Sequence, residues 1–81
     1  MNRTEFTERM KANHIPDFCY NLTGTGNDDE RYNLVQLQDG TWEAYYGERG
    51  HKNQRRVFGA EEEALAYIAK RLLPNLPGTG R

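Results

Sequence analysis

Hydrophobic and polar residues follow one another along the chain with two different periods, and each period predicts one kind of element. Near the start, Phe6 and Met10 lie four residues apart in a polar stretch, which is the spacing of one face of a helix. Asn2 or Thr4 can cap this helix, and the proline that follows must stop it. We therefore expect a helix over residues 4–13.

A second stripe with helical spacing lies near the end of the chain, over residues 61–73. Its apolar members are Ala64, Leu65, Ile68 and Leu72. Three glutamates at its start and Lys70-Arg71 near its end complement the helix dipole. The pattern predicts a helix that buries one face.

Between the two helices, a period of two predicts four short strands. They fall at residues 18–22, 31–38, 41–47 and 55–58. Asp39-Gly40 predicts a two-residue type I′ turn between the second and third strands, because both central positions of that turn need a positive φ. A longer loop over residues 47–54 should precede the fourth strand.

This order of elements predicts one α+β domain over residues 1–73, followed by a disordered tail over residues 74–81. Short connections favour a four-stranded antiparallel meander between an N-terminal and a C-terminal helix. Both helices would cover one face of the sheet, and the other face would be open to solvent.

Composition narrows the class of protein. The single cysteine, Cys19, excludes disulfides within the chain and favours a reducing compartment. No apolar leader and no segment of membrane-spanning length is present, so we expect a cytoplasmic protein. The net charge of −1 weighs against a general phosphate-binding surface.

Residues suited to catalysis are few. The two histidines, His14 and His51, and the lone cysteine offer no closely spaced ligand pair for zinc. A Cys19–His14 nucleophile pair is conceivable, but Cys19 stands between two aromatic residues and is expected to be packed. The glycine-rich residues 23–26 have neither a following helix nor a Lys-Ser/Thr pair, as a phosphate loop requires. We predict no catalytic residue, no metal, no cofactor and no enzyme activity.

Charged and aromatic residues are segregated. Trp42 and Tyr46 would face the helices, whereas Tyr45 and Glu43 would lie on the open face, with Tyr45 as an exposed contact anchor. Four cations and no acid lie within residues 49–56, namely Arg49, Lys52, Arg55 and Arg56. Acids gather instead in a free loop, Asp28-Asp29-Glu30, and at the start of the last helix, Glu61-Glu62-Glu63.

Part of this pattern resembles a family of short bacterial immunity proteins, which are encoded beside polymorphic toxins of contact-dependent and related secretion systems. The resemblance rests on Trp42, Tyr45-Tyr46, Glu48-Arg49-Gly50 and Lys52, and continues at Phe58, Glu61, Glu63, Ala64 and Tyr67. It covers most of residues 6–73. It implies an antitoxin that blocks the active site of a cognate toxin or an adjacent surface. Such toxins are often nucleases, NAD-degrading enzymes or ADP-ribosyltransferases with basic substrate sites.

An acidic surface would complement a basic toxin and speed its association. The residues expected to bind the toxin are Asp28, Asp29, Glu30, Glu43, Tyr45, Glu48 and Arg49. For Glu48 and Arg49 an internal role is equally open, namely an ion pair that stabilises the hairpin, with Gly50 supplying a positive φ.

Two other functions remain open from the sequence. The order of elements is close to that of a double-stranded-RNA-binding domain, and residues 49–56 supply cations. However, such domains carry lysines at the start of the last helix, where this chain has Glu61-Glu62-Glu63. A small regulatory subunit is the third class, and exposed strand edges also make a homodimer conceivable.

Overall fold

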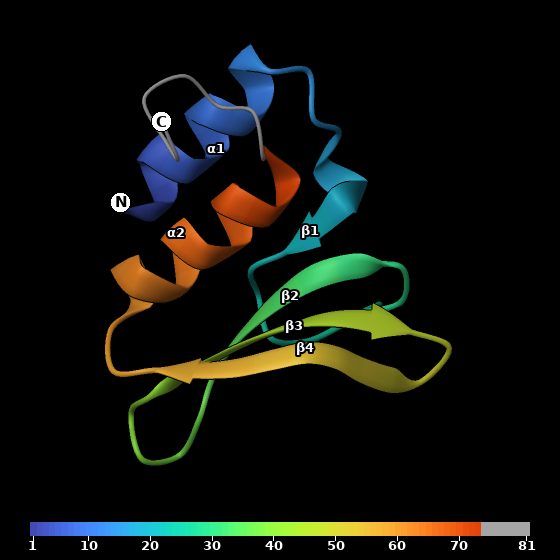
Figure 1. Ribbon diagram of the computed structural model, residues 1–81, viewed down its shortest axis with the longest axis vertical. Coiled ribbons are helices and arrows are strands. Elements are labelled where there is room, and N and C mark those ends of the chain that lie inside the picture. The colour runs from blue at the N-terminus through green and yellow to red at the C-terminus, as the bar shows by residue number, and fades with distance from the viewer. Residues whose placement is uncertain (74–81) are drawn as a thin grey trace.

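The computed structural model describes residues 1–73 (Figure 1). The elements are α1 (Arg3–Ala12), a 3-10 turn (Asp17–Cys19), β1 (Tyr20–Asn21), β2 (Arg31–Gln36), β3 (Trp42–Glu48), β4 (His51–Phe58) and α2 (Glu61–Leu72). The α+β class is therefore as predicted. The predicted disordered tail over residues 74–81 lies outside the described residues.

Both helices form where the apolar spacing predicts them. Asn2 caps α1: its side chain accepts the Glu5 N–H at 2.8 Å, and the Glu5 carboxylate accepts the Asn2 N–H at 3.1 Å. Phe6 and Met10 are fully buried on one face of α1. The buried face of α2 consists of Ala64, Leu65, Ile68 and Ala69.

The sheet has the order β1-β2-β3-β4, but it is not the predicted antiparallel meander. β2, β3 and β4 are antiparallel neighbours, whereas β1 runs parallel to β2. Parallel neighbours start at the same end, so the chain has to return between them. Because β1 has only two residues, residues 22–30 are long enough for this return.

The two hairpin turns differ from the predictions. After β2 only Gly40 has a positive φ, and the Leu37 N–H donates to the Thr41 carbonyl at 2.8 Å, so the loop has three residues and no type I′ turn. The expected long loop over residues 47–54 is absent, because Arg49 and Gly50 both have positive φ (52° and 81°) and form a tight two-residue turn. β4 therefore begins at His51.

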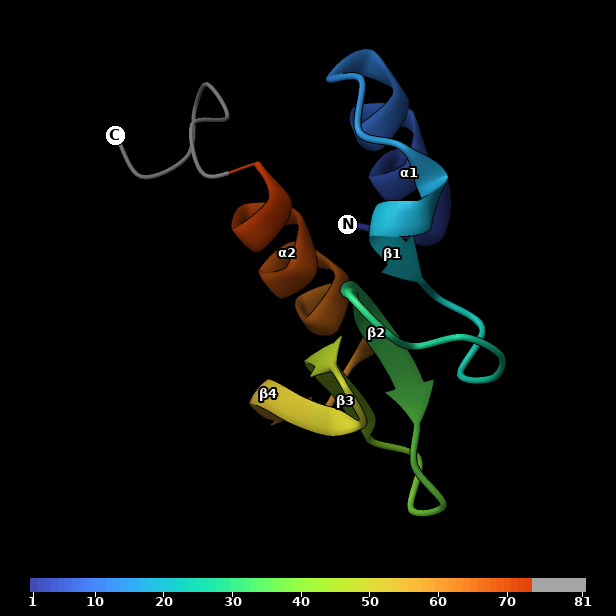
Figure 2. The ribbon, with the colours of Figure 1, turned by 90° about the vertical axis from the view of Figure 1, so that its right-hand side faces the viewer.

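The core lies between the sheet and α2. Leu34 and Ala44 from the strands meet the buried face of α2, and Trp42 is partly buried against this core as predicted. Tyr46 is also partly buried, with its ring edge to face with that of Tyr32 at 5.0 Å. α1 lies alongside α2 (Figures 1 and 2), and Phe6 of α1 meets Tyr20 edge to face with ring centroids 5.1 Å apart. α2 is thus the main cover of one sheet face, and the prediction that both helices cover this face is not confirmed.

Candidate functional site

The second face of the sheet is only partly open, because residues 23–30, the covering loop, lie against β2 and β3, whereas Val57 of β4 stays exposed. The loop crosses β2 (Figure 2), and Gly24 comes close to the backbone of Leu34 and Val35. Asn21, at the end of β1, organises the loop: its side chain accepts from the Thr23 N–H at 3.0 Å and donates to the Thr25 carbonyl at 2.7 Å. The glycine-rich residues therefore form an ordered loop held by hydrogen bonds, and not merely a flexible connection.

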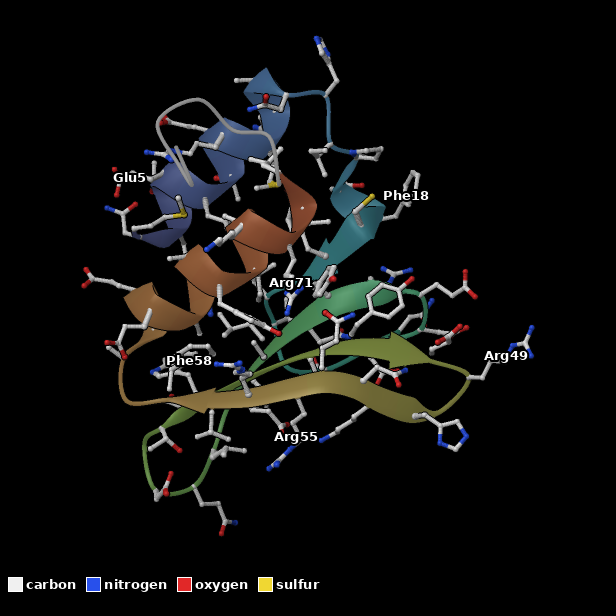
Figure 3. All side chains as sticks on the ribbon, in the orientation of Figure 1. Glu5, Phe18, Arg49, Arg55, Phe58 and Arg71 are labelled. Carbon is white, nitrogen blue, oxygen red and sulfur yellow. The ribbon has the colours of Figure 1, made fainter. Side chains whose placement is uncertain are left out.

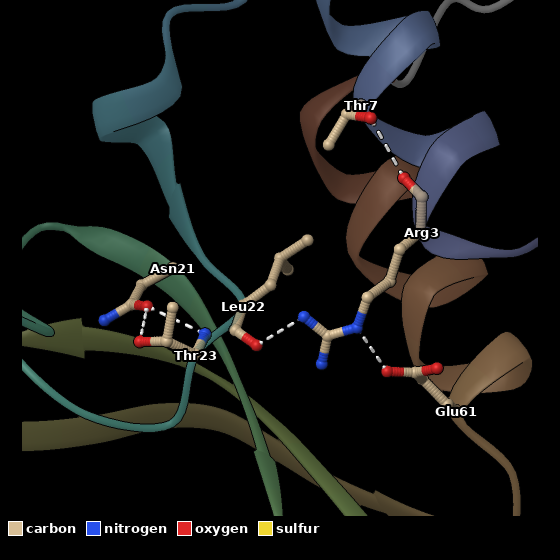
Figure 4. A network of polar contacts seen from close by, with 6 residues as sticks. All are labelled: Arg3, Thr7, Asn21, Leu22, Thr23 and Glu61. Atoms are coloured by element: carbon tan, nitrogen blue, oxygen red, sulfur yellow. Dashed lines mark hydrogen bonds and ion pairs between the residues drawn. The ribbon is translucent and has the colours of Figure 1, made fainter.

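Arg3 ties the start of this segment to both helices (Figure 4). Its guanidinium donates to the Leu22 carbonyl at 2.8 Å and to the Glu61 carboxylate at 2.6 Å. One side chain of α1 therefore links α2 with the chain that enters the covering loop. The side chains of this ion pair are partly exposed, so the pair contributes little to the free energy of unfolding. Its main effect is to fix the position of the chain at Leu22.

Gly47 is the point of closest approach between the covering loop and β3. A Cβ atom there would lie 2.0 Å from the Asp28 carbonyl oxygen. The Glu30 N–H donates to the Gly47 carbonyl at 2.7 Å, and the Asn33 side-chain amide donates to the Asp28 carbonyl at 2.9 Å. The loop can adopt this position only because residue 47 has no side chain.

Tyr45 does lie on the face away from α2, but the prediction that it is an exposed anchor is wrong. The covering loop leaves it only 5% exposed, and its hydroxyl donates to the Asp28 carboxylate at 2.9 Å. The Lys52 ammonium lies 4.7 Å from the ring centroid. Burial, together with the Asp28 carboxylate, raises the pKa of Tyr45 to about 12. Tyr45 and Asp28 are supports of the loop.

Glu43 is also buried, at 2% exposed, where a partner's cations were expected to reach it. Its carboxylate instead pairs with Lys52, at 3.0 Å, and with Arg55. Burial alone would raise the pKa of Glu43, but the hydrogen bonds from these two cations outweigh it and hold the pKa below its ordinary value. Glu43 is thus satisfied within the chain.

A bulge in β4 explains how Glu43 obtains both cations. Tyr45 of β3 faces two residues of β4, Gln54 and Arg55, and Gln54 has a φ of 56°. Side chains three positions apart on a regular strand point to opposite faces. The extra residue puts Lys52 and Arg55 on the same face. Gln54 turns towards the other face and accepts a hydrogen bond from the Tyr67 hydroxyl at 3.1 Å through its carbonyl.

Four of the predicted contact acids lie on the surface, at the end of the sheet where β3 turns into β4, but the carboxylate of one of them, Asp28, is already bound to Tyr45. The other three, Asp29, Glu30 and Glu48, are called the acidic end below. Asp29 accepts the Arg49 backbone N–H at 2.7 Å, which joins the covering loop to the hairpin tip. The Arg49 side chain extends away from the domain (Figure 3). The structure thus brings the predicted loop and hairpin together.

The alternative role for Glu48 and Arg49 is answered in part. Within residues 1–73 they form no ion pair with each other; Glu48 instead accepts from the Asn53 side chain at 3.4 Å. Gly50 does supply the positive φ that the turn requires. The Arg49 guanidinium has no hydrogen bond to the described residues, so its charge is available to a partner.

A basic site that the sequence reasoning missed lies between β4 and α2. A pocket of about 450 Å³ is lined by Arg56 of β4 and by Tyr67, Lys70 and Arg71 of α2. Arg71 points from α2 towards the strands (Figure 3). In the sequence, Arg56 belongs to the basic residues 49–56, whereas Lys70 and Arg71 lie near the end of the last helix, where cations complement the helix dipole. Only the packing of α2 on the sheet brings them together.

Other chemistry suggested by the sequence finds no further support. In the part of the chain that is described, the Cys19 thiol and the His14 imidazole form no hydrogen bond with each other, and no three His, Cys, Asp or Glu side chains are placed to hold a metal ion. None of the helices over residues 1–73 has the length and apolar character needed to span a membrane.

Comparison with known proteins leaves the family open. No family model, curated protein or solved structure matches the chain. The resemblance to bacterial immunity proteins therefore stays a prediction that rests on the residues named for it.

Proposed function

We propose that this protein is an immunity protein that binds a cognate secreted bacterial toxin domain and neutralises it by covering its active site or an adjacent surface. It would act as a binding protein in the cytoplasm, without a cofactor and without catalysing a reaction. The observation that carries the proposal is the acidic end, an exposed group of acids held in place by hydrogen bonds to the hairpin and by the part-buried bonds of Asn33 and Tyr45 to Asp28.

Rigid presentation matters for tight binding, because ordering a mobile loop at an interface lowers affinity. In the acidic end the ordering is already done by the fold. The Asp29 carboxylate accepts the Arg49 N–H, and the Glu30 backbone N–H donates to the Gly47 carbonyl, both at 2.7 Å. Fixed acids would steer a basic toxin into the correct orientation and raise the association rate.

The predicted binding residues divide into two roles in this proposal. Asp29, Glu30 and Glu48 would contact the toxin directly. Asp28, Glu43 and Tyr45 would act through the scaffold, since their polar groups are engaged inside the domain. The proposal therefore keeps all seven predicted residues but transfers three of them from contact to support.

Co-expression with the toxin domain encoded next to this gene tests the proposal. The Glu30→Lys/Glu48→Lys double variant should lose protection of growth, and its association rate should fall about tenfold or more at low salt. The Glu62→Lys/Glu63→Lys variant is the matched control, because it makes the same charge change at exposed positions of α2. Equal protection by both variants would exclude the acidic end as the interface.

A substitution that stabilises the turn can distinguish a direct contact by the Arg49 side chain from a structural role. Asparagine tolerates the positive φ of residue 49 better than arginine, so Arg49→Asn should stabilise the turn by about 0.5 kcal/mol. Weaker toxin binding by this more stable variant would show direct contact by the guanidinium. Replacing Asp28, Asp29 and Glu30 together by serine also weakens binding, but it mixes lost contacts with a released Tyr45.

An RNA-binding module is the second candidate, and the basic pocket of Arg56, Lys70 and Arg71 favours it. The start of α2 disfavours RNA binding, because Glu61, Glu62 and Glu63 would repel the phosphates there. A titration with structured RNA at moderate salt separates the two functions: the immunity proposal expects no saturable binding.

A further inference from the structure

The basic pocket is built to hold its guanidinium groups in place. Arg56 and Arg71 lie 5.7 and 5.2 Å from the centroid of the Tyr67 ring, within the range of cation–π attraction. Phe58 packs against the same ring at 5.4 Å. Within residues 1–73 no carboxylate pairs with Arg56, Lys70 or Arg71. Their N–H donors can therefore bind the oxygens of an anionic group.

The pocket adjoins the β4 edge of the sheet, which no other strand within residues 1–73 covers. β4 is the last strand of the sheet, and its eight residues are nearly all exposed. Every second residue of an edge strand turns its N–H and C=O away from its neighbour. Glu48 and His51 close the two-residue turn as a hydrogen-bonded pair. Counting back along β3, Glu43 and Val57 form a non-hydrogen-bonded pair, so the Val57 backbone points outward.

The charge along β4 restricts which strand could pair with this edge. Lys52, Arg55 and Arg56 all lie on β4, which has no acid. Antiparallel pairing of two copies would oppose cation to cation, and like charges directly opposite are destabilising. A homodimer through this edge is therefore disfavoured. A strand rich in glutamate or aspartate would pair with cations on both faces.

We propose that the β4 edge and the basic pocket together form a docking site for an extended acidic segment of another protein. The segment adds to the sheet beside β4, and one of its carboxylates enters the pocket between Arg56, Lys70 and Arg71. This site is distinct from the acidic end, which suits a basic partner, so the two proposals stand or fall separately.

An acidic polypeptide fits these features better than a nucleic acid. The aromatic ring in the pocket is surrounded by Arg56, Arg71 and Phe58, so it offers no free platform for a base to stack on. A row of outward N–H and C=O groups is complementary to a peptide backbone and has no counterpart in a phosphate chain.

The probe is a short synthetic peptide of alternating glutamate and threonine with blocked ends, labelled for fluorescence anisotropy. The reference peptide has lysine in place of glutamate, and a structured RNA forms a separate arm. We expect saturable binding of the acidic peptide alone. In amide NMR spectra, the resonances of β4 should shift more than those of β2.

Two variants test the two parts of the site. Arg56→Glu should weaken peptide binding about tenfold, because an attractive cross-strand pair becomes repulsive. Val57→Pro removes an outward N–H without removing a bond to β3, and should abolish the β4 shifts. Lys11→Glu on α1 is the charge-matched control and should bind as the unaltered protein does. Circular dichroism checks folding, and if Val57→Pro does not fold, the shift map of the unaltered protein still locates the peptide.

Three results would overturn the inference. The first is absence of acidic-peptide binding at low salt. The second is binding that Val57→Pro leaves unchanged, since that would reflect charge attraction without strand pairing. The third is saturable RNA binding that Arg56→Glu abolishes, which would assign the pocket to phosphate.

Discussion

The contact between Gly47 and the covering loop offers a sharp test of this structure. In the Gly47→Ala variant the new Cβ would lie 2.0 Å from the Asp28 carbonyl oxygen and 3.2 Å from the Asn33 amide nitrogen. Carbon and oxygen cannot approach so closely, so the loop must retreat by more than about 1 Å. A shift of that size takes hydrogen bonds of ordinary length beyond their useful range.

Three hydrogen bonds depend on the position of the loop. They are Glu30 N–H to the Gly47 carbonyl (2.7 Å), the Asn33 amide to the Asp28 carbonyl (2.9 Å) and the Tyr45 hydroxyl to the Asp28 carboxylate (2.9 Å). Each contributes about 1 kcal/mol net, so the variant should lose about 2–3 kcal/mol of unfolding free energy. In a domain of this size, that corresponds to a fall of about 10–20 °C in Tm.

Thermal unfolding followed by circular dichroism measures the loss, and Gly59→Ala is the control. Nothing lies within 4 Å of a Cβ at Gly59, and its φ is ordinary, so that variant should melt at or slightly above the unaltered protein. NMR titration of labelled tyrosine gives a local readout, because release of the loop should lower the pKa of Tyr45 from about 12 towards its ordinary value. If Gly47→Ala and Gly59→Ala unfold at the same temperature and the pKa of Tyr45 is unchanged, the packing of the loop on the sheet is refuted.

Two further changes probe the buried polar groups. Glu43→Gln should cost about 1–2 kcal/mol at neutral pH in urea unfolding, since Lys52 and Arg55 are half exposed and water replaces part of the pair. The pKa of Glu43 is lowered in the folded state, so its contribution to stability is present above pH 4.5 and is lost as the pH falls below that value. The unfolding free energy of the Glu43→Gln variant should therefore fall less in acid than that of the unaltered protein. Parallel pH profiles of the two proteins would contradict this. Tyr45→Phe should cost about 1 kcal/mol by removing the bond to Asp28. Since the pKa of Tyr45 is raised in the folded state, the unaltered protein should lose stability between pH 10 and about 12, and a Phe variant with the same alkaline loss would exclude Tyr45 as its source.

The hairpins show where local sequence signals succeed and fail. Asp39-Gly40 does form a turn, but the Asp39 carboxylate accepts from the N–H and hydroxyl of Thr41, which favours a three-residue loop over type I′. Arg49-Gly50 forms the type I′ geometry although arginine is a poor residue for its first position. Pairing of β4 along β3 imposes that conformation, and no property of Arg49 itself predicts it.

The candidate site shows the same division. Periodicity correctly placed Tyr45 and Glu43 on the sheet face away from α2, but it could not reveal that residues 23–30 return across that face. Nor could it reveal the bulge at Gln54, which turns two cations towards Glu43. The basic pocket was missed for a related reason, since Arg56 and Arg71 are distant in sequence and meet only through the packing of α2.

The sequence by itself determined the features that depend on neighbours a few positions apart: the capped start of α1, the buried faces of both helices and the alternation along β2 and β3. Spacing along the chain decides these features, because a helix or strand fixes where each side chain points. The tertiary structure decided which polar groups are buried and which remain on the surface. The burial of Tyr45 and the bond of its hydroxyl to Asp28 depend on how a loop packs against a strand about twenty residues away, and one missing Cβ at Gly47 permits that packing. The ion pairs of the buried Glu43 depend on the bulge in β4.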